Sequence, residues 1–340
     1  MSFDPQKPYN DLPLLPPKQD IETRNILRKT ITAGRALAEL KGLGETIPNQ
    51  SMLVNSVVLQ EAKASSEIEN IITTDDALFR AFTTKTSRVD PSTKEVLRYR
   101  EALWEGYKEL KKRPILATNL FVKLVQRIKE NQAGIRRTPG TTISNANLED
   151  YIHGEDNIDP LIKLALIHYQ FEIIHPFSDG NGRTGRIINI LYLVFQGLLD
   201  LPVLYLSKFV IDRKNDYYRL LRLVTEKGEW EPWILYMLDA VEETATFTRK
   251  RILDIRDLMA ETMKVAKETL PGRVYSKELI ELLFRQPYTK GQSLVDAGIA
   301  KRKTAAEYLK DLEKTGILTG KKIGREMLYL NTRLYDLLSK

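Results

Sequence analysis

The chain has 340 residues, of which 42% are hydrophobic and 29% are charged, and it contains no cysteine. This length predicts two or three domains, and the missing cysteines exclude disulfides and thiolate metal sites. Its apolar stretches are too short to span a bilayer, and its first residues lack the pattern of a secretory signal. We therefore expect a soluble protein of the cytoplasm.

The positive charge is concentrated at the C-terminal end. The net charge of the whole chain is +7, and residues 301–340 hold ten Lys or Arg against five Asp or Glu, which gives +5. A basic terminal segment can attract an anionic partner such as nucleic acid, although an ordinary solvated surface has the same composition.

The chain begins with a proline-rich arm and continues as helices. Five prolines within residues 1–20 disfavour helix there. Apolar residues at spacings of three and four then predict helices over 20–40, 51–70, 96–112 and 115–131.

A turn-rich stretch separates these helices from a second apolar set. Pro139-Gly140 and the β-branched residues after it predict a loop or short hairpin over 134–148. Beyond it, the apolar periodicity predicts helices over 160–174, 186–199, 214–223 and 230–263. The main body therefore belongs to the all-α class.

The pattern changes after Leu270-Pro271-Gly272. Three short helices are predicted over 276–284, 290–297 and 301–315, followed by strands over 317–319 and 327–330 around a Gly324-Arg325 tip. Three helices and a small β-wing are typical of a winged helix-turn-helix, which is an α+β module.

The most informative segment runs from His175 to Arg186 and reads HPFSDGNGRTGR. Its three glycines allow tight turns, and the helix that follows presents unpaired N–H groups suited to a phosphate. Arg183 and Arg186 lie one helical turn apart as phosphate donors, and Asp179 is a hard oxygen ligand for Mg²⁺. Histidine titrates near neutral pH, so His175 can accept a proton from a hydroxyl nucleophile.

Each of these features has a structural explanation when it occurs alone. A histidine after an apolar helix usually packs or caps, Gly-x-Gly is usually a turn, and paired arginines are usually solvated. Their union within twelve residues favours nucleotidyl transfer, in which catalysis is mainly positioning and charge neutralisation.

The segment resembles the Fic family motif, His-x-Phe-x-Asp/Glu-Gly-Asn-Gly-Arg-x-x-Arg, at every defined position. The resemblance implies an all-helical Fic core with a short β-hairpin flap. It also implies an enzyme that transfers AMP from Mg-ATP to a Ser, Thr or Tyr hydroxyl of a protein, itself included, and releases pyrophosphate.

The resemblance also implies a role for each motif residue. His175 is the base, Phe177 anchors the loop in the core, and Asp179 holds Mg²⁺. The residues implied to bind the phosphates of ATP are Gly180, Asn181, Gly182, Arg183 and Arg186.

A second motif, Ser65-Ser66-Glu67-Ile68-Glu69-Asn70, ends the helix predicted over 51–70. It resembles the family's inhibitory pattern, Ser/Thr-x-x-x-Glu-Gly/Asn, with Ser65, Glu69 and Asn70 at the defined positions. By this resemblance Glu69 pairs with Arg186 and displaces the γ phosphate, since a carboxylate and a phosphate compete for one guanidinium. Taken alone, the six-residue pattern is also explained by an ordinary charged helix end, but its position before a full Fic motif favours inhibition. In some members such a glutamate orients water to remove AMP, so a de-AMPylase remains an alternative.

The flap of the family holds the target backbone by strand-like pairing, and here it corresponds to Thr141, Thr142 and Ile143. The segment after it is shorter than in similar members. The predicted division of the chain is 1–110 for an N-terminal helical region with the inhibitory helix, 111–265 for the catalytic core, and 270–340 for the winged helix.

A second class of function is a nucleotide-sensing DNA-binding regulator. Lys301, Arg302 and Lys303 open the predicted recognition helix, and such charges contact phosphates without reading bases. Winged helices bind DNA or protein, and both remain open, as does a homodimer. A sensor has no need of the base His175, so the enzyme is favoured. His168 is expected to be a packed, hydrogen-bonded residue, and His153 is expected in a polar loop. The aromatic residues expected as core and capping residues are Tyr217, Tyr218, Trp230 and Trp233.

Overall fold

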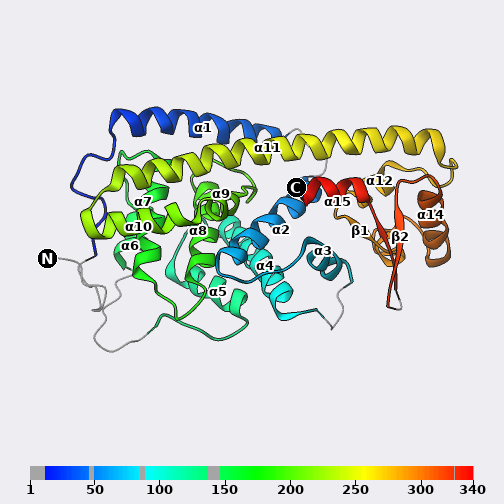
Figure 1. The fold of residues 1–340 in the computed structure, drawn as a ribbon, viewed down its shortest axis with the longest axis horizontal. Coiled ribbons are helices and arrows are strands. Elements are labelled where there is room, and N and C mark those ends of the chain that lie inside the picture. The colour runs from blue at the N-terminus through cyan, green and yellow to red at the C-terminus, as the bar shows by residue number, and fades with distance from the viewer. Residues whose placement is uncertain (1–11, 46–49, 85–88, 137–145, 325, 340) are drawn as a thin grey trace.

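The computed structural model describes residues 12–45, 50–84, 89–136, 146–324 and 326–339 (Figure 1). The described chain is a body of helices with one small antiparallel sheet near its C-terminal end. The predicted fold class, an all-α body with a small α+β module, is confirmed. The predicted flap residues 141–143 lie outside the described ranges.

Two long helices form one side of the molecule. Helix α1 (Arg24–Glu45) lies along α11 (Trp230–Thr269), which runs on to the β-containing end (Figure 1). Buried residues recur on one side of α11 at helical spacing, including Trp233 and Met237, so this side faces the core.

The first set of body helices lies beneath α1 and α11. These are α2 (Gln50–Ile68), α3 (Asp75–Thr84), α4 (Pro91–Lys112), α5 (Thr118–Lys129) and α6 (Ala146–His153). The α4 helix starts sharply because Asp90 accepts a hydrogen bond from Thr93 N and Pro91 occupies the first turn.

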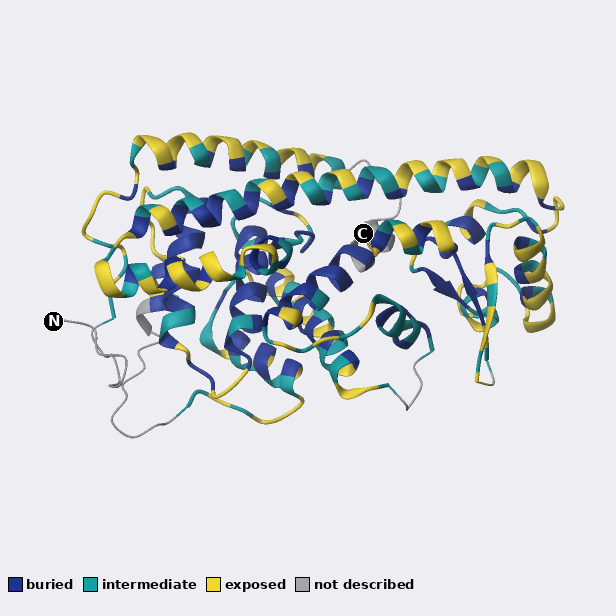
Figure 2. Cartoon of the chain, viewed as in Figure 1, coloured by how far each residue is buried: buried dark blue, intermediate teal, exposed yellow. Residues whose placement is uncertain are grey.

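Helices α7 (Pro160–Ile174) and α8 (Asn181–Phe195) form the centre of the body, and most of their residues are buried (Figure 2). The shorter helices α9 (Leu206–Asp212) and α10 (Lys214–Lys227) complete it. A helix that is apolar on all sides belongs in a core, and α7 fits this rule. The loop between α7 and α8 is therefore held by two rigid, buried elements.

The sequence predictions fail at several boundaries. Helix α8 begins at Asn181 and not at Arg186, because the left-handed Gly180 turns the chain directly into the helix and Gly180 O accepts the first helical bond from Thr184 N. Residues 146–148 belong to helix α6 and not to a hairpin. The helices that the periodicity does not predict are short or depend on tertiary packing, namely α3, α6, α9 and the C-terminal α15 (Thr332–Leu338).

The C-terminal module has the predicted winged helix-turn-helix order. Its elements are α12 (Lys277–Leu283), β1 (Tyr288–Thr289), α13 (Gly291–Asp296), α14 (Arg302–Lys314), β2 (Thr319–Ile323) and β3 (Glu326–Leu330). The sheet order is β1-β3-β2, both pairings are antiparallel, and Thr319 lies opposite Leu330 in the β2–β3 hairpin. The two-residue strand β1 was not predicted, since it exists only by pairing with the distant β3.

This module contacts the body through α11 and α3. Tyr288 OH donates to Asp76 Oδ1 over 2.5 Å, and Thr83 Oγ1 donates to Tyr288 O over 3.3 Å. Among the described residues, no helix is both long and apolar enough for a membrane crossing.

Candidate active site

His175 stands at the C-terminal end of α7, where the chain leaves the core. It takes a left-handed conformation with φ of 50°, and its N–H bonds to Phe171 O over 3.1 Å. The following Pro176 cannot continue the helix, and its carbonyl accepts a hydrogen bond from Arg136 N over 2.8 Å. The imidazole is exposed, so it can reach a substrate from outside.

The hydrogen bond of the imidazole determines its tautomer. His175 Nδ1 lies 3.3 Å from the carbonyl oxygen of Glu172. A carbonyl only accepts, so this bond requires the proton on Nδ1 and leaves the Nε2 lone pair free. The geometry therefore supports His175 as a proton acceptor.

The loop after His175 is held from inside. Phe177 is 1% exposed and packs near Phe171, with ring centroids 6.3 Å apart. The Asn181 side chain accepts from Phe177 N over 2.8 Å and donates to Phe177 O over 2.7 Å. The amide of Asn181 thus closes the loop and leaves only its backbone N–H to face a phosphate.

The first turn of α8 offers an anion site. Gly180 adopts φ of 84° as its N-cap, and within the described chain no side chain caps the helix. The Glu69 carboxylate lies directly over this turn, since a Cβ added to Gly182 would overlap with Glu69 Oε1. Unpaired N–H groups and the positive end of the helix dipole favour an anion here. The carboxylate of Glu69, which directly follows the end of α2, lies beside that position.

Besides lying over the α8 turn, Glu69 binds Arg186. Its Nη2 donates to Glu69 Oε1 and to Ser65 O, each over 2.8 Å, and its Nε donates to Ser65 Oγ over 2.8 Å. The Arg186 side chain is 1% exposed, whereas that of Glu69 is 34% exposed. Two of the residues singled out in the 65–70 motif therefore meet the end of the 175–186 motif.

The end of α2 explains why Asn70 belongs to that motif. Asn70 adopts a left-handed φ of 60°, and Ile71 N bonds back to Ser66 O over 3.0 Å. This is the pattern of a Schellman helix end. Its left-handed position is usually occupied by glycine and sometimes by asparagine. The turn ends α2 next to Glu69, and the carboxylate reaches across to α8.

Arg183 faces a different set of residues. Its Nη1 donates to Glu95 Oε1 over 2.6 Å, and Lys129 Nζ donates to the same oxygen over 2.8 Å. Lys129 Nζ also lies 2.6 Å from Asp179 Oδ2. Burial would raise the pKa of Glu95, but hydrogen bonds from Lys129 and Arg183 outweigh it and leave the pKa lowered. Glu95 therefore stays ionised between two cations.

Glu172 adds a second carboxylate near Arg186. Its Oε1 is buried without a hydrogen-bond partner among the described residues, and it would overlap with a Cβ on Gly185. Burial raises the pKa of Glu172 to about 7; Arg186 opposes this shift and Glu69 adds to it. This carboxyl group therefore titrates within the site near neutral pH.

Sequence reasoning missed several contributors to this site. Glu95, Lys129 and Glu172 carry no motif signal, because their importance comes from contacts across the fold. Arg136 also supports the loop, since its Nη2 donates to Ile174 O over 3.3 Å. Glu172 is the only acidic residue of the largely apolar α7, but α7 also contains the charged Lys163, so its charge alone does not mark it as a site residue.

The remaining histidines have structural roles. His168 is 1% exposed, its Nε2 lies 2.9 Å from Tyr217 OH, and burial lowers its pKa to about 3. The prediction of a packed, hydrogen-bonded His168 is confirmed. Tyr217, Trp230 and Trp233 are buried as expected, whereas Tyr218 is 47% exposed and is not a core residue. His153 ends α6, where a loop was expected, and its Nε2 lies 3.2 Å from Leu116 O.

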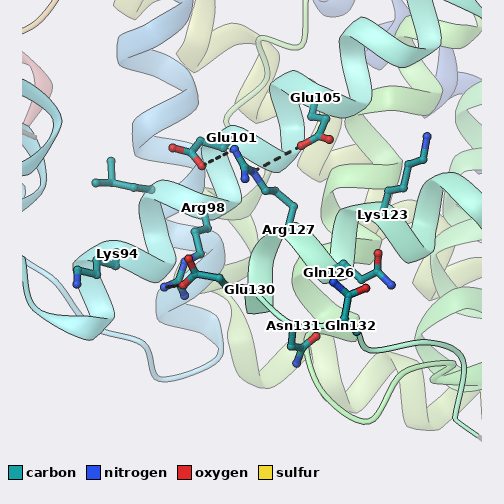
Figure 3. A pocket seen from close by; sticks show the side chains of 11 residues that line it. Lys94, Arg98, Glu101, Glu105, Lys123, Gln126, Arg127, Glu130, Asn131 and Gln132 are labelled. Carbon is teal, nitrogen blue, oxygen red and sulfur yellow. Dashed lines mark hydrogen bonds and ion pairs between the residues drawn. The ribbon is translucent and has the colours of Figure 1, made fainter.

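A groove of about 680 Å³ lies between α4 and α5, away from the motif (Figure 3). Its walls carry ion pairs, including Arg127 with Glu101 at 3.1 Å and with Glu105 at 3.5 Å. None of residues 175–186 lines it. This groove is therefore separate from the candidate active site.

The fold and the site define a class: a helical protein with an exposed histidine beside a helix N-terminus that no described side chain caps. Three family models match the chain: Fic/DOC family N-terminal over 27–108, Fic/DOC family over 91–193, and Protein adenylyltransferase SoFic-like, C-terminal domain, over 258–334. Residues 27–193 therefore carry the Fic/DOC family domains.

Curated relatives match about a quarter of the chain. Protein adenylyltransferase Fic of Drosophila willistoni is 34% identical over 98 residues, which is 28% of this chain and 18% of that protein. Protein adenylyltransferase fic-1 of Caenorhabditis elegans is 31% identical over 93 residues, which is 27% of this chain and 17% of that protein. The match thus spans less than a fifth of the length of these relatives.

Solved structures share the fold. A Fic family protein from Desulfovibrio desulfuricans covers 91% of this chain, and 96% of its own chain is matched, with a TM-score of 0.56 and 20% identity. A fragment of Fic-1 from C. elegans covers 69% of this chain, and 74% of the fragment is matched, with a TM-score of 0.54 and 18% identity. At these identities the likeness concerns the fold alone.

Proposed function

We propose that this protein is an adenylyltransferase that moves AMP from ATP to a hydroxyl group of a protein. The observation that carries the proposal is that one short loop joins two groups. His175, whose Nε2 can accept a proton, stands at its start, and the uncapped first turn of α8 stands at its end. The relatives named protein adenylyltransferase support the same reaction, which is a nucleotidyl transfer.

In the proposed reaction the hydroxyl oxygen attacks the α phosphorus of ATP. His175 Nε2 takes the hydroxyl proton, a new P–O bond forms, and the bond to the bridging oxygen breaks so that pyrophosphate leaves. The backbone of Gly180, Asn181 and Gly182 and the positive helix end would stabilise the phosphates. Arg186 would bind a terminal phosphate through its guanidinium fork.

Mg²⁺ fits this site with Asp179 as its protein ligand. Among the described residues no group of three or more His, Cys, Asp or Glu forms a metal cage. Mg²⁺ on nucleotides needs only one or two carboxylates, because phosphates and waters complete its octahedron. Asp179 is 62% exposed, so its carboxylate is accessible, and Mg²⁺ would replace the contact with Lys129 there. When bound, the ion neutralises phosphate charge.

We further propose that Glu69 restrains this activity. Its carboxylate lies over the α8 turn and pairs with Arg186, both of which a triphosphate would need. The carboxylate and a phosphate cannot occupy the same hydrogen-bond donors at once, so Glu69 would keep the triphosphate away from them. The same carboxylate could instead position a water for removal of AMP, so a de-AMPylase is the alternative at this site.

The test is transfer of label from α-³²P-ATP, with magnesium, to the protein itself and to proteins of a cell lysate. In a Glu69→Gly background, His175→Ala should reduce labelling at least ~100-fold, the usual contribution of a general base. His153→Ala is the matched control and should keep its label. Equal labelling by the His175→Ala protein and its parent would remove the proposed reaction. Self-labelling is the first expected signal.

The winged helix offers a second candidate function, binding of duplex DNA. Lys301, Arg302 and Lys303 are exposed at the start of α14, and Lys321 and Lys322 are exposed on the wing. The full-length protein with these five lysines and arginines changed to glutamine should lose salt-dependent DNA binding. A protein partner for this module, a homodimer and a cytoplasmic location remain predictions.

A further inference from the structure

The candidate base His175 has a backbone conformation that its surroundings must maintain. Among the described residues only three other than glycine have a positive φ, namely Asn70, Glu130 and His175. A left-handed conformation brings the Cβ of an L-residue too close to the backbone, so it persists only where neighbouring contacts outweigh the strain. The direction of the side chain relative to α7 depends on φ, so the same contacts decide where the imidazole points.

The end of α7 shows the contacts that His175 makes for itself. The last four carbonyls of a helix have no partner within it. His175 supplies donors for two of them, because its N–H binds Phe171 O over 3.1 Å and its Nδ1 lies 3.3 Å from Glu172 O. The second contact depends on the direction of the imidazole, and therefore on φ of His175.

Arg136 supplies donors on both sides of His175. Its Nη2 donates to Ile174 O over 3.3 Å, and its backbone N–H donates to Pro176 O over 2.8 Å. The Ile174 carbonyl lies in the peptide plane that rotates when φ of His175 changes, and the φ of Pro176 is fixed by its ring. The two bonds therefore hold the chain immediately before and immediately after the base.

The chemistry of Arg136 suits this place. A cation is stabilised near the C-terminal end of a helix, where unpaired carbonyls carry partial negative charge. The guanidinium is planar and presents its N–H groups in fixed directions, so it holds a carbonyl more rigidly than a lysine ammonium does. Arg136 Nε is buried, so this part of the side chain lies against the protein.

We propose that Arg136 is a positioning residue for the base. It holds His175 in the left-handed conformation, so that Nδ1 stays on Glu172 O and Nε2 is free to accept a proton. Neither of its two bonds reaches the first turn of α8, so its loss should slow proton removal and leave ATP binding intact. The role in catalysis rests on the proposed function, whereas the role in the conformation of His175 does not.

The kinetic test uses Arg136→Met, which removes the guanidinium and keeps the backbone N–H. In a Glu69→Gly background, the rate of self-labelling at saturating ATP should fall at least ~10-fold, while the ATP concentration for the half-maximal rate should stay within about twofold. Arg136→Lys keeps the charge and one donor, so its rate should lie between the two. A rate that Arg136→Met leaves unchanged, or lowers only through a higher requirement for ATP, overturns the proposal.

The matched control is Arg127→Met. It removes a guanidinium that pairs with Glu101 and Glu105 in the groove between α4 and α5, away from the motif. Neither the rate nor the ATP requirement should change. Equal loss of rate in Arg127→Met and Arg136→Met overturns the proposal, because it would mean that any lost guanidinium in this part of the fold slows the enzyme.

The tautomer of His175 gives a readout that needs no AMP transfer. The chain has three histidines, so ¹⁵N spectra of the imidazole rings are simple, and a His175→Ala variant identifies the signals of His175. At about pH 8 the parent should show the tautomer with the proton on Nδ1, whereas Arg136→Met should show both tautomers. An unchanged tautomer in the folded Arg136→Met protein overturns the proposal.

The two readouts separate two kinds of failure. If the Glu69→Gly protein transfers no label, the proposed function fails, and the tautomer still decides the role of Arg136. If Arg136→Met does not fold, as thermal melts would show, Arg136→Lys takes its place and must show both the lower rate and the mixed tautomer.

Discussion

Arg183 and Arg186 lie one turn apart on α8, each 1% exposed, yet their surroundings differ in kind. Arg183 is held by Glu95 of α4, which Lys129 of α5 shares. Arg186 is held by Ser65 and Glu69, at the very end of α2. The first network joins helices of the core, whereas the second depends on one segment next to a turn. Two arginines of the same helix thus have different surroundings: Arg183 is held within the helical core, and Arg186 is held by a helix end.

Of the changes that separate the Arg183 and Arg186 surroundings, removal of Glu69 should have the largest effect, and it should act on the rate of AMP transfer. Glu69→Gly frees Arg186 and the α8 turn, so AMP transfer should rise roughly 10- to 100-fold, the equivalent of one charge-assisted hydrogen bond of about 1.5–3 kcal/mol. Initial rates of label transfer from ATP measure it.

The matched control is Glu67→Gly, which removes an exposed carboxylate two residues earlier on α2 and should leave the rate unchanged. If both glycine variants label alike, the contact between Glu69 and Arg186 does not restrain the enzyme.

Removal of Glu95 should act on stability. Glu95→Gln leaves the buried Arg183 without its carboxylate, and the free energy of unfolding should fall by roughly 2–4 kcal/mol, as for a broken, partly buried ion pair. Urea unfolding followed by circular dichroism measures the change.

The control for this variant is Glu101→Gln on the same helix. Glu101 is 46% exposed and pairs with Arg127 at 3.1 Å, so its loss should cost at most ~1 kcal/mol. Equal losses in the two variants would show that Arg183 does not depend on Glu95.

The smallest expected effect concerns Glu172 and pH. A pKa raised to about 7 means that the folded protein keeps a proton that the unfolded chain releases above its ordinary value of 4.5. Stability from this group is therefore present at pH 4.5 and is lost as pH rises toward 7. Glu172→Gln should be stabilised relative to the parent by roughly 1–3 kcal/mol at pH 8 and by little at pH 5. A stability difference that does not grow with pH, in melts at both values, would contradict this.

The periodicity of apolar residues predicted most of the long helices, because a helix buries one side whatever its neighbours are. It failed for α3, α9 and β1, which are short and formed by tertiary contacts. The 65–70 and 175–186 motifs were both visible in the sequence. Glu95 and Lys129 were not, since nothing local distinguishes them from other surface charges.

The sequence by itself determined the resemblance to the Fic family, the order of the long helices and the C-terminal helices and strands, and the positions of the candidate base and of the glycine turn before α8. These depend on neighbouring residues, whose types and spacing act locally through turns, caps and helical faces. Only the tertiary structure decided that Glu69 lies against Arg186, that Glu95 lies between Arg183 and Lys129, and that Arg136 binds the carbonyls on both sides of His175. Such contacts join residues far apart in the chain, and their geometry follows from how whole helices pack.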